Sequence, residues 1–194
     1  MPDLRDRLFT YRSYTPIPFL VLGLIFGQPT AQSMAIGIVM AILGESLRFW
    51  GVGHATSLTR VTGSVGAPRL VVSGPFAYLR NPLYLGNMLL YTGFGVMSNR
   101  PILIAATALW FVFQYWMIVS REEEFLAKEF PEEYTLYRAS VPKFIPRLTP
   151  YGADRQSRIQ WMVAVRSERR TFQAFAIALL LMSARYFFLR PTGG

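Results

Sequence analysis

The sequence predicts an all-α fold, a polytopic membrane helical bundle of about five spans in a single domain covering residues 1–194. The first reason is composition: 52% of the residues are hydrophobic and 16% are charged, whereas soluble domains carry about 25% charged residues. The second reason is that five apolar runs alternate with polar segments along the chain. The third is a positive mean hydropathy. These observations are typical of a multi-pass integral membrane protein.

Each apolar run predicts one helix. The first run is short for a membrane span. Residues 98–100 alone separate the third run from the fourth, which predicts a helical hairpin with Pro101 in the first turn of its second helix. The five runs cover residues 15–27, 34–52, 83–97, 101–119 and 172–189.

The distribution of basic residues predicts the orientation in the membrane. Segment 121–170 holds 10 of the 20 Lys and Arg residues, and the N-terminal tail and segment 53–81 hold three each. The positive-inside rule therefore places the N-terminus and both polar segments in the cytoplasm. Anionic membrane lipids explain the net charge of +9, so lipid rather than nucleic acid is the expected partner. Segments 141–150 and 151–170 either shape the entrance to a site or lie along this lipid as a basic surface helix, and the second arrangement is expected.

The composition disfavours metal-dependent chemistry. The chain has no Cys, which excludes disulfides and thiolate metal sites, and a single His, His54. We therefore expect no metal site and a structural role for His54. This residue lies in the polar segment 53–80, which ends near a β-like patch at residues 70–72.

The first candidate motif, residues 74–86, reads GPFAYLRNPLYLG and lies where a polar segment meets the third apolar run. Arg80 and Asn81 stand against that apolar run. A guanidinium at a membrane boundary is costly without an anionic partner. The candidates for this partner are a lipid headgroup, a ligand carboxylate or an acidic side chain from elsewhere in the chain.

The second candidate motif, residues 121–146, reads REEEFLAKEFPEEYTLYRASVPKFIP. Its Pro131 predicts a kink or a break into two short helices. The block Glu122, Glu123 and Glu124 either forms a solvated helix turn or turns inward to meet a cation. A pocket lined by these acids and by Arg80 would suit a zwitterionic ligand. One apolar stripe with helical spacing runs through the motif: Leu126, Phe130, Tyr134, Tyr137 and Val141.

Glu45 and Arg48 place two charges inside the second apolar run. Their i,i+3 spacing puts both on one helix face, where they can pair. They form either a buried structural ion pair near a helix end or part of the lining of a polar cavity.

Both motifs resemble those of the isoprenylcysteine carboxyl methyltransferase and phospholipid methyltransferase superfamily. GPFAYLRNPLYLG looks like GPYRYxRHPxYxG, and the second motif looks like EExxLxxxFGxxYxxYxxxVPRFIP. The stretch GESLRFW, residues 44–50, resembles the GxxLRxW helix of the same family. The resemblance covers about residues 40–147, with a catalytic core of about 44–147.

The resemblance implies an S-adenosylmethionine-dependent methyltransferase built into the membrane, without the soluble Rossmann fold. Its cofactor site would lie on the cytoplasmic face, built from interhelical loops and a C-terminal helical segment. The implied acceptor is lipophilic and enters from the bilayer, as an isoprenylcysteine-type carboxylate or a phospholipid amine.

The resemblance also implies roles for individual residues. Arg80 and Glu123 are the implied catalytic residues: Arg80 would orient a carboxylate acceptor, and Glu123 would act as general base for an amine acceptor. Methyl transfer itself needs in-line positioning and exclusion of water. The implied cofactor-binding residues are Leu70, Val71, Gly74, Tyr78, Asn81, Tyr84, Gly86, Glu122 and Glu123.

The chain departs from the family pattern at three positions. Asn81 replaces a His, which keeps hydrogen bonding but not proton transfer. Pro131 replaces a Gly at the helix join, and Lys143 replaces an Arg, which removes a bidentate fork. Two other functions stay open: an NADPH-dependent membrane reductase of the sterol and steroid reductase type, and a non-catalytic membrane scaffold or small transporter.

Overall fold

The computed structural model describes residues 3–55, 70–152 and 159–188, so residues 56–69 of the first polar segment lie outside the description. The described residues form helices and contain no β-strand, which confirms the predicted all-helical class. The patch at residues 70–72 is therefore extended chain rather than a strand. In chain order the elements are α1 (Leu4–Tyr11), α2 (Pro16–Phe26), α3 (Ala31–His54), the 3-10 helix η2 (Gly74–Ala77), α4 (Pro82–Met97), α5 (Pro101–Glu129), α6 (Pro131–Ser140) and α7 (Trp161–Phe188).

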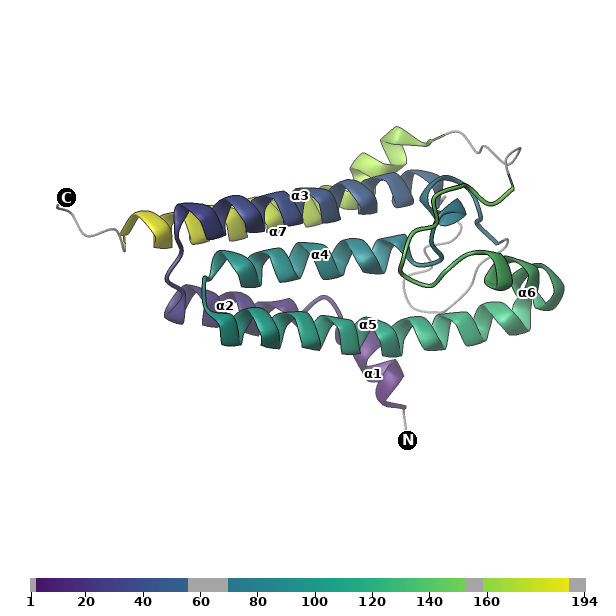
Figure 1. Cartoon of the computed structure of the whole chain (residues 1–194), viewed down its shortest axis with the longest axis horizontal. Coiled ribbons are helices and arrows are strands. Elements are labelled where there is room, and N and C mark those ends of the chain that lie inside the picture. Colours follow the sequence, from purple (N-terminus) through teal and green to yellow (C-terminus); the bar gives the residue numbers. More distant parts are fainter. Residues whose placement is uncertain (1–2, 56–69, 153–158, 189–194) are drawn as a thin grey trace.

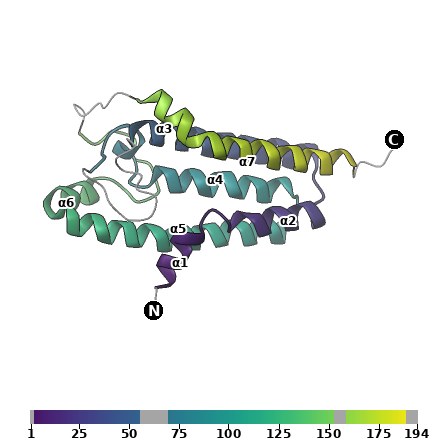
Figure 2. The same cartoon turned by 180° about the vertical axis from the view of Figure 1, so that it is seen from behind.

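The long helices α3, α4, α5 and α7 run side by side along the molecule (Figure 1). α3 and α7 form one layer, α4 lies in the middle, and α5 forms the other layer together with the shorter α2. The view from behind shows the same three layers (Figure 2). η2, α6 and the loops of both motifs gather at one end of this bundle, and the α2–α3 and α4–α5 connections lie at the other.

Paired glycines bring α3 and α4 into close contact. A Cβ atom added at Gly86 would lie 2.6 Å from the carbonyl oxygen of Gly44, and one at Gly93 would lie 2.6 Å from that of Gly37. Both pairs repeat at seven-residue spacing along each helix, so they lie on one face of α3 and one face of α4. Small residues at such positions let helix backbones approach closely in membranes. This contact fixes the depth and rotation of α4, which carries the end of the first motif.

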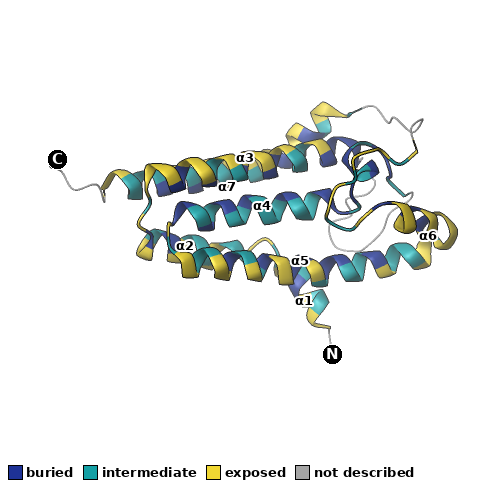
Figure 3. Cartoon of the chain, viewed as in Figure 1, coloured by how far each residue is buried: buried dark blue, intermediate teal, exposed yellow. Residues whose placement is uncertain are grey.

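Within the described residues, three helices, α3, α5 and α7, are long and apolar enough to cross a membrane. The first and third apolar runs form α2 and α4, which have 11 and 16 residues, fewer than the roughly 20 of a typical span. Exposed residues follow the outer sides of the long helices, whereas α4 is mostly buried or half-buried (Figure 3). Because these exposed faces are apolar, they suit contact with lipid.

Two helices extend beyond the apolar runs that predicted them. α5 continues to Glu129, and Pro131 begins α6 one residue after it, as predicted for a break into two helices. α7 begins at Trp161 instead of residue 172, so residues 161–170 are helical as expected but belong to the same helix as the fifth apolar run. Charged residues end a hydropathy run, but Arg and Glu are good helix formers and do not end a helix.

Candidate functional site

Arg80 and Glu123 form a buried ion pair that joins the two motifs. The Arg80 Nε donates to Glu123 Oε1 over 2.9 Å. Its Nη1 donates to the carbonyl oxygens of Val141, at 2.6 Å, and Arg138, at 3.1 Å. The partner of Arg80 is therefore an acidic side chain of the second motif, one of the three candidates that the sequence left open. It also follows that Glu123 turns inward rather than into solvent.

Two more side chains complete the surroundings of Glu123. Asn81 Nδ2 donates to Glu123 Oε1 over 3.1 Å and lies 3.3 Å from the carbonyl oxygen of Lys143. The Lys143 ammonium lies 3.5 Å from Glu123 Oε2 and 4.4 Å from the centre of the Trp116 ring. We call Arg80, Asn81, Glu123 and Lys143 the motif cluster. Two cations and an amide surround one buried carboxylate there, so its charge and its hydrogen bonds are satisfied inside the protein.

Backbone hydrogen bonds fasten the loops of the two motifs to each other. The amide of Arg80 donates to the Pro142 carbonyl over 2.9 Å, and the amide of Arg147 donates to the Tyr78 carbonyl over 3.0 Å. The amide of Tyr151 donates to the Ala77 carbonyl over 2.9 Å. The first motif is thus bonded to residues 142–151 at several points.

The predicted apolar stripe of the second motif packs under these loops, as its spacing indicated. Tyr134, Tyr137 and Val141 form a buried cluster with Val72, with Leu126 and Phe130 against it. The Tyr137 hydroxyl donates to the Phe76 carbonyl over 2.7 Å. Burial raises the pKa of Tyr134 and the pKa of Tyr137, so both remain neutral phenols at physiological pH.

Tyr84 and Glu122 form a second contact between the motifs, one helix turn farther along α4. The Tyr84 hydroxyl donates to Glu122 Oε1 over 2.5 Å. Both residues line a cavity of about 1210 Å³ that also reaches Arg80, Asn81 and Glu123. The cavity extends from the motif loops into the bundle between α4, α5 and α7.

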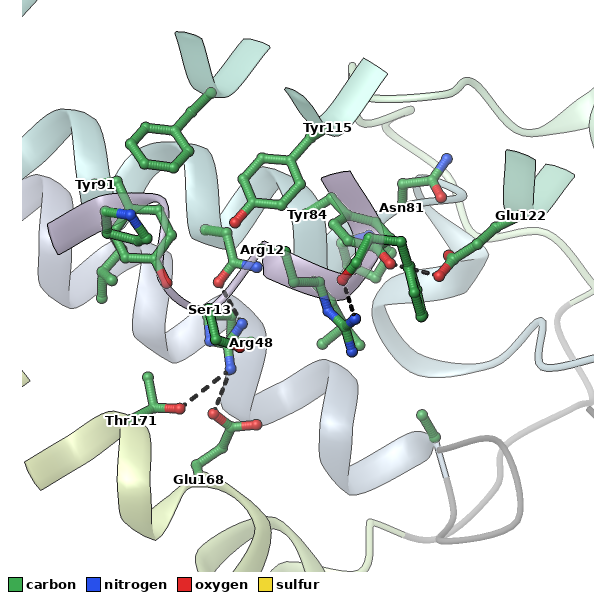
Figure 4. A pocket seen from close by; sticks show the side chains of 18 of the residues that line it. Arg12, Ser13, Arg48, Asn81, Tyr84, Tyr91, Tyr115, Glu122, Glu168 and Thr171 are labelled. Atoms are coloured by element: carbon green, nitrogen blue, oxygen red, sulfur yellow. Dashed lines mark hydrogen bonds and ion pairs between the residues drawn. The ribbon is translucent and has the colours of Figure 1, made fainter. Parts of the chain in front are cut away.

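Farther into the bundle, Arg48 joins three helices around the same cavity (Figure 4). It binds Glu168 of α7 over 2.5 Å and Asn87 of α4, and its Nε lies 3.3 Å from Glu45. Thr171 lies 3.4 Å from the guanidinium. We call these five residues the interhelical cluster. Both readings of the Glu45–Arg48 spacing hold, because the pair is buried and Arg48 lines the cavity.

The cavity collects most of the site residues that the sequence predicted. Gly74, Tyr78 and Gly86 are the predicted contacts that lie away from its lining. Gly74 has φ +59°, and a Cβ there would lie 2.5 Å from His54 Cδ2, so glycine allows the η2 loop to pack on this ring. Gly86 serves the contact between α3 and α4 described above. The predicted contacts that do line the cavity are Leu70, Val71, Asn81, Tyr84, Glu122 and Glu123.

Sequence reasoning missed Asn87, Glu168 and Arg12, which also line the cavity. The sequence did offer a pointer to Asn87, since it lies three residues after Tyr84, a spacing that makes two side chains neighbours on a helix surface. Glu168 is the lone acid among the basic residues that begin α7, and it is completely buried. No sequence pattern around Arg12 predicted that it would line the cavity. Within the described ranges, no group of three or more acidic or His side chains could hold a metal ion.

Comparison with known proteins identifies the family of residues 32–133. A family model described as phospholipid methyltransferase matches residues 32–133. The cobalt-zinc-cadmium resistance protein CzcN of Cupriavidus metallidurans is 31% identical over 169 residues, which cover 86% of this chain and 74% of that protein. The nickel-cobalt-cadmium resistance protein NccN of Alcaligenes xylosoxydans xylosoxydans is 30% identical over 61% of this chain and 51% of its own length.

A eukaryotic enzyme also matches the chain. Protein-S-isoprenylcysteine O-methyltransferase of Rattus norvegicus is 35% identical over 116 residues, which cover 58% of this chain and 40% of that protein. The chain therefore spans less than half of the rat enzyme. No solved structure matches the chain.

Arg80 and Glu123, whose ion pair joins the two motifs, both lie inside the matched residues 32–133, which make up more than half of the 194 residues. The family match thus confirms the resemblance over the whole first motif and over residues 121–133 of the second. The chain belongs to the phospholipid methyltransferase family of integral membrane methyltransferases.

Proposed function

We propose that the protein transfers a methyl group from S-adenosylmethionine to a lipophilic, membrane-resident acceptor at the cytoplasmic face. One observation carries the proposal: both motifs converge on a single cavity, with Arg80 and Asn81 bonded to Glu123 and Tyr84 bonded to Glu122. The basic segments at this end of the bundle support its cytoplasmic placement.

The residues present fit such a cofactor. Its methionine part is zwitterionic and its sulfonium is a cation, so it needs acidic groups, and Glu122 lines the cavity. The volume of about 1210 Å³ exceeds the roughly 300–1,000 Å³ of common ligand sites, which leaves room for an acceptor beside the cofactor.

The cofactor supplies an electrophilic methyl group, and the chain supplies position, charge and exclusion of water. The motif cluster holds the loops in place, because Arg80 binds two carbonyls of the second motif as well as Glu123. Glu122 lines the cavity and places a carboxylate within reach of a sulfonium or an ammonium. Buried aromatic side chains at the cavity, such as Tyr115 and Phe111, exclude water from the transfer.

The geometry favours a positioning role for Glu123 over the general-base role inferred from the family. Its Oε1 accepts from Arg80 and Asn81, and its Oε2 faces Lys143. Both carboxylate oxygens of Glu123 thus face donors of the motif cluster, so neither is free to contact an acceptor. A carboxylate acceptor needs no base, whereas an amine acceptor must lose a proton, and Glu122 is the cavity carboxylate better placed to take it.

Calorimetric titration of the purified protein with S-adenosylmethionine, and separately with NADPH, tests the proposal. We expect the first to bind and the second not to bind. Glu122→Gln should weaken cofactor binding by about tenfold, because it removes one charge-assisted hydrogen bond to the ligand. Glu132→Gln, an exposed acid on α6, is the matched control and should bind normally.

Incubation of lipid extracts with methyl-labelled cofactor then identifies the acceptor by headgroup separation. Binding of NADPH would favour the reductase, and binding of neither would favour the scaffold. An Arg80→Ala protein with full transfer activity would also contradict the assignment.

A further inference from the structure

The N-terminal helix α1 is fastened to α5 beside the acidic block of the second motif. Leu8 is buried against Phe111, Tyr115 and Ile118. The Arg5 Nη1 lies 2.6 Å from Glu124 Oε1. A second ion pair joins Asp6 to Arg121. Apolar burial and two charge contacts therefore hold α1 at the level where Glu122 faces the cavity.

The end of α1 and the chain that follows it reach the cavity itself. Phe9 of α1 lines it, as do Arg12, Ser13 and Tyr14 after the helix. Arg12 is half-buried, its Nη1 donates to the Phe9 carbonyl over 2.5 Å, and its guanidinium lies 3.9 Å from the centre of the Phe9 ring. These contacts hold the Arg12 guanidinium at the cavity, which Tyr84 and Glu122 also line (Figure 4).

The other buried cations of the cavity already have acidic partners. Arg80 pairs with Glu123, and Arg48 pairs with Glu45 and Glu168. Arg12 has no carboxylate within ion-pair distance in the described part of the chain. Arg170, which also lines the cavity, is exposed on α7. A half-buried guanidinium without an acidic partner favours binding of an anion.

We propose that Arg12 binds the carboxylate of the cofactor's methionine part and that Glu122 faces its ammonium. The inference rests on the proposed function and extends it, since Arg12 lies outside the matched residues 32–133. Opposite charges on one lining, one on α5 and one on the segment after α1, match a zwitterionic amino acid. An arginine fork suits a carboxylate because it can donate two parallel hydrogen bonds. The N-terminal segment is then part of the cofactor site.

Titration with two ligands that differ in this one group tests the inference. S-adenosylmethionine carries the carboxylate, and its decarboxylated analogue lacks it. The unmodified protein should prefer S-adenosylmethionine by about tenfold, and Arg12→Gln should lose this preference by weakening only the carboxylate-bearing ligand. Arg7→Gln replaces an exposed arginine of α1 and should keep the preference. Arg12→Lys keeps the charge without the fork and should retain the preference in part.

The outcomes separate this inference from the proposed function. Binding of neither ligand by the unmodified protein would contradict the proposed function itself. Binding of both with a preference that survives in Arg12→Gln would overturn the role of Arg12 and leave the proposed function standing. Equal weakening of both ligands would also overturn it, because Arg12 would then act on the fold or on another anion, such as a lipid phosphate. If Arg12→Gln unfolds, an Arg12→Lys protein with an undiminished preference gives the same negative answer.

Discussion

Two buried arginine–glutamate pairs organise this molecule, and they differ in what they hold together. In the motif cluster, Arg80 binds Glu123 and also two backbone carbonyls of the second motif. In the interhelical cluster, Arg48 binds side chains of α4 and α7. Arg80 thus organises loops, whereas Arg48 joins helices.

The two pairs also differ in where their partners lie in the chain. Arg80 and Glu123 both fall inside the residues that match the methyltransferase family, but Glu168 lies beyond them. The first pair therefore belongs to the core that defines the family. The second attaches α7 to that core and closes one side of the cavity with a helix from outside the matched residues.

Removing Arg80 should have the largest effect of any single change. Arg80→Met leaves Glu123 and two carbonyls without their shared donor, and loss of one partner of a buried pair costs about 3–5 kcal/mol. We expect a large fall in the thermal unfolding midpoint in detergent and loss of S-adenosylmethionine binding. Arg48→Met should lower the midpoint as well, with cofactor binding affected less.

Removing both partners of each pair sharpens this comparison. Arg48→Met with Glu168→Leu and Glu45→Gln replaces a set of side-chain contacts by neutral groups, which is often nearly neutral for stability. Arg80→Met with Glu123→Leu still leaves the carbonyls of Arg138 and Val141 without their donor. The first combination should recover most of the lost midpoint and the second should not. Equal recovery in both would show that the backbone contacts of Arg80 contribute little.

The members of the motif cluster sit in short, recognisable patterns, but the sequence left the partner of Arg80 open among three candidates. The arginine needed an anion, the acids stood at the end of a span, and the apolar stripe after them indicated a helix packed beneath the loops. The structure brings these segments together through contacts between Arg80 and Glu123. Roles in cofactor binding and catalysis stay predictions.

The interhelical cluster was only half predictable. Helix periodicity links Glu45 to Arg48, but Glu168 lies 120 residues away from Arg48, and no local pattern connects residues so far apart. Hydropathy also misplaced the start of α7, because the basic residues before the apolar run hid a continuous helix. The cavity depends on how α1, α4, α5 and α7 pack, which spacing along one segment does not encode.

The glycine contact between α3 and α4 supports both clusters. Disturbing it should lower the stability of the fold by an intermediate amount. A Cβ at Gly86 would lie 2.6 Å from Gly44 oxygen and 2.6 Å from Arg48 Cγ. Gly86→Ala must therefore push the helices apart, and overpacking of this kind costs about 1–3 kcal/mol. We expect a lower unfolding midpoint in detergent. In the control Gly23→Ala, the nearest atom lies at an ordinary 3.6 Å, so this helical position should be neutral or gain up to about 1 kcal/mol. Similar losses in both variants would contradict close packing at Gly86.

Restoring the family residue at Asn81 should have the smallest effect. Asn81 is buried and donates to Glu123, and an imidazole N–H can make the same contact. Asn81→His should therefore change cofactor affinity by less than the roughly 0.5–1.5 kcal/mol of one neutral hydrogen bond, whereas Asn81→Leu removes the donor and should weaken binding by more. Calorimetry on both variants gives the cofactor affinity, and incubation with methyl-labelled cofactor gives the rate of methyl transfer. A large gain in this rate with Asn81→His, at unchanged affinity, would show that the side chain at position 81 moves a proton. Equal affinities in all three proteins would show instead that Arg80 and Lys143 suffice to hold Glu123.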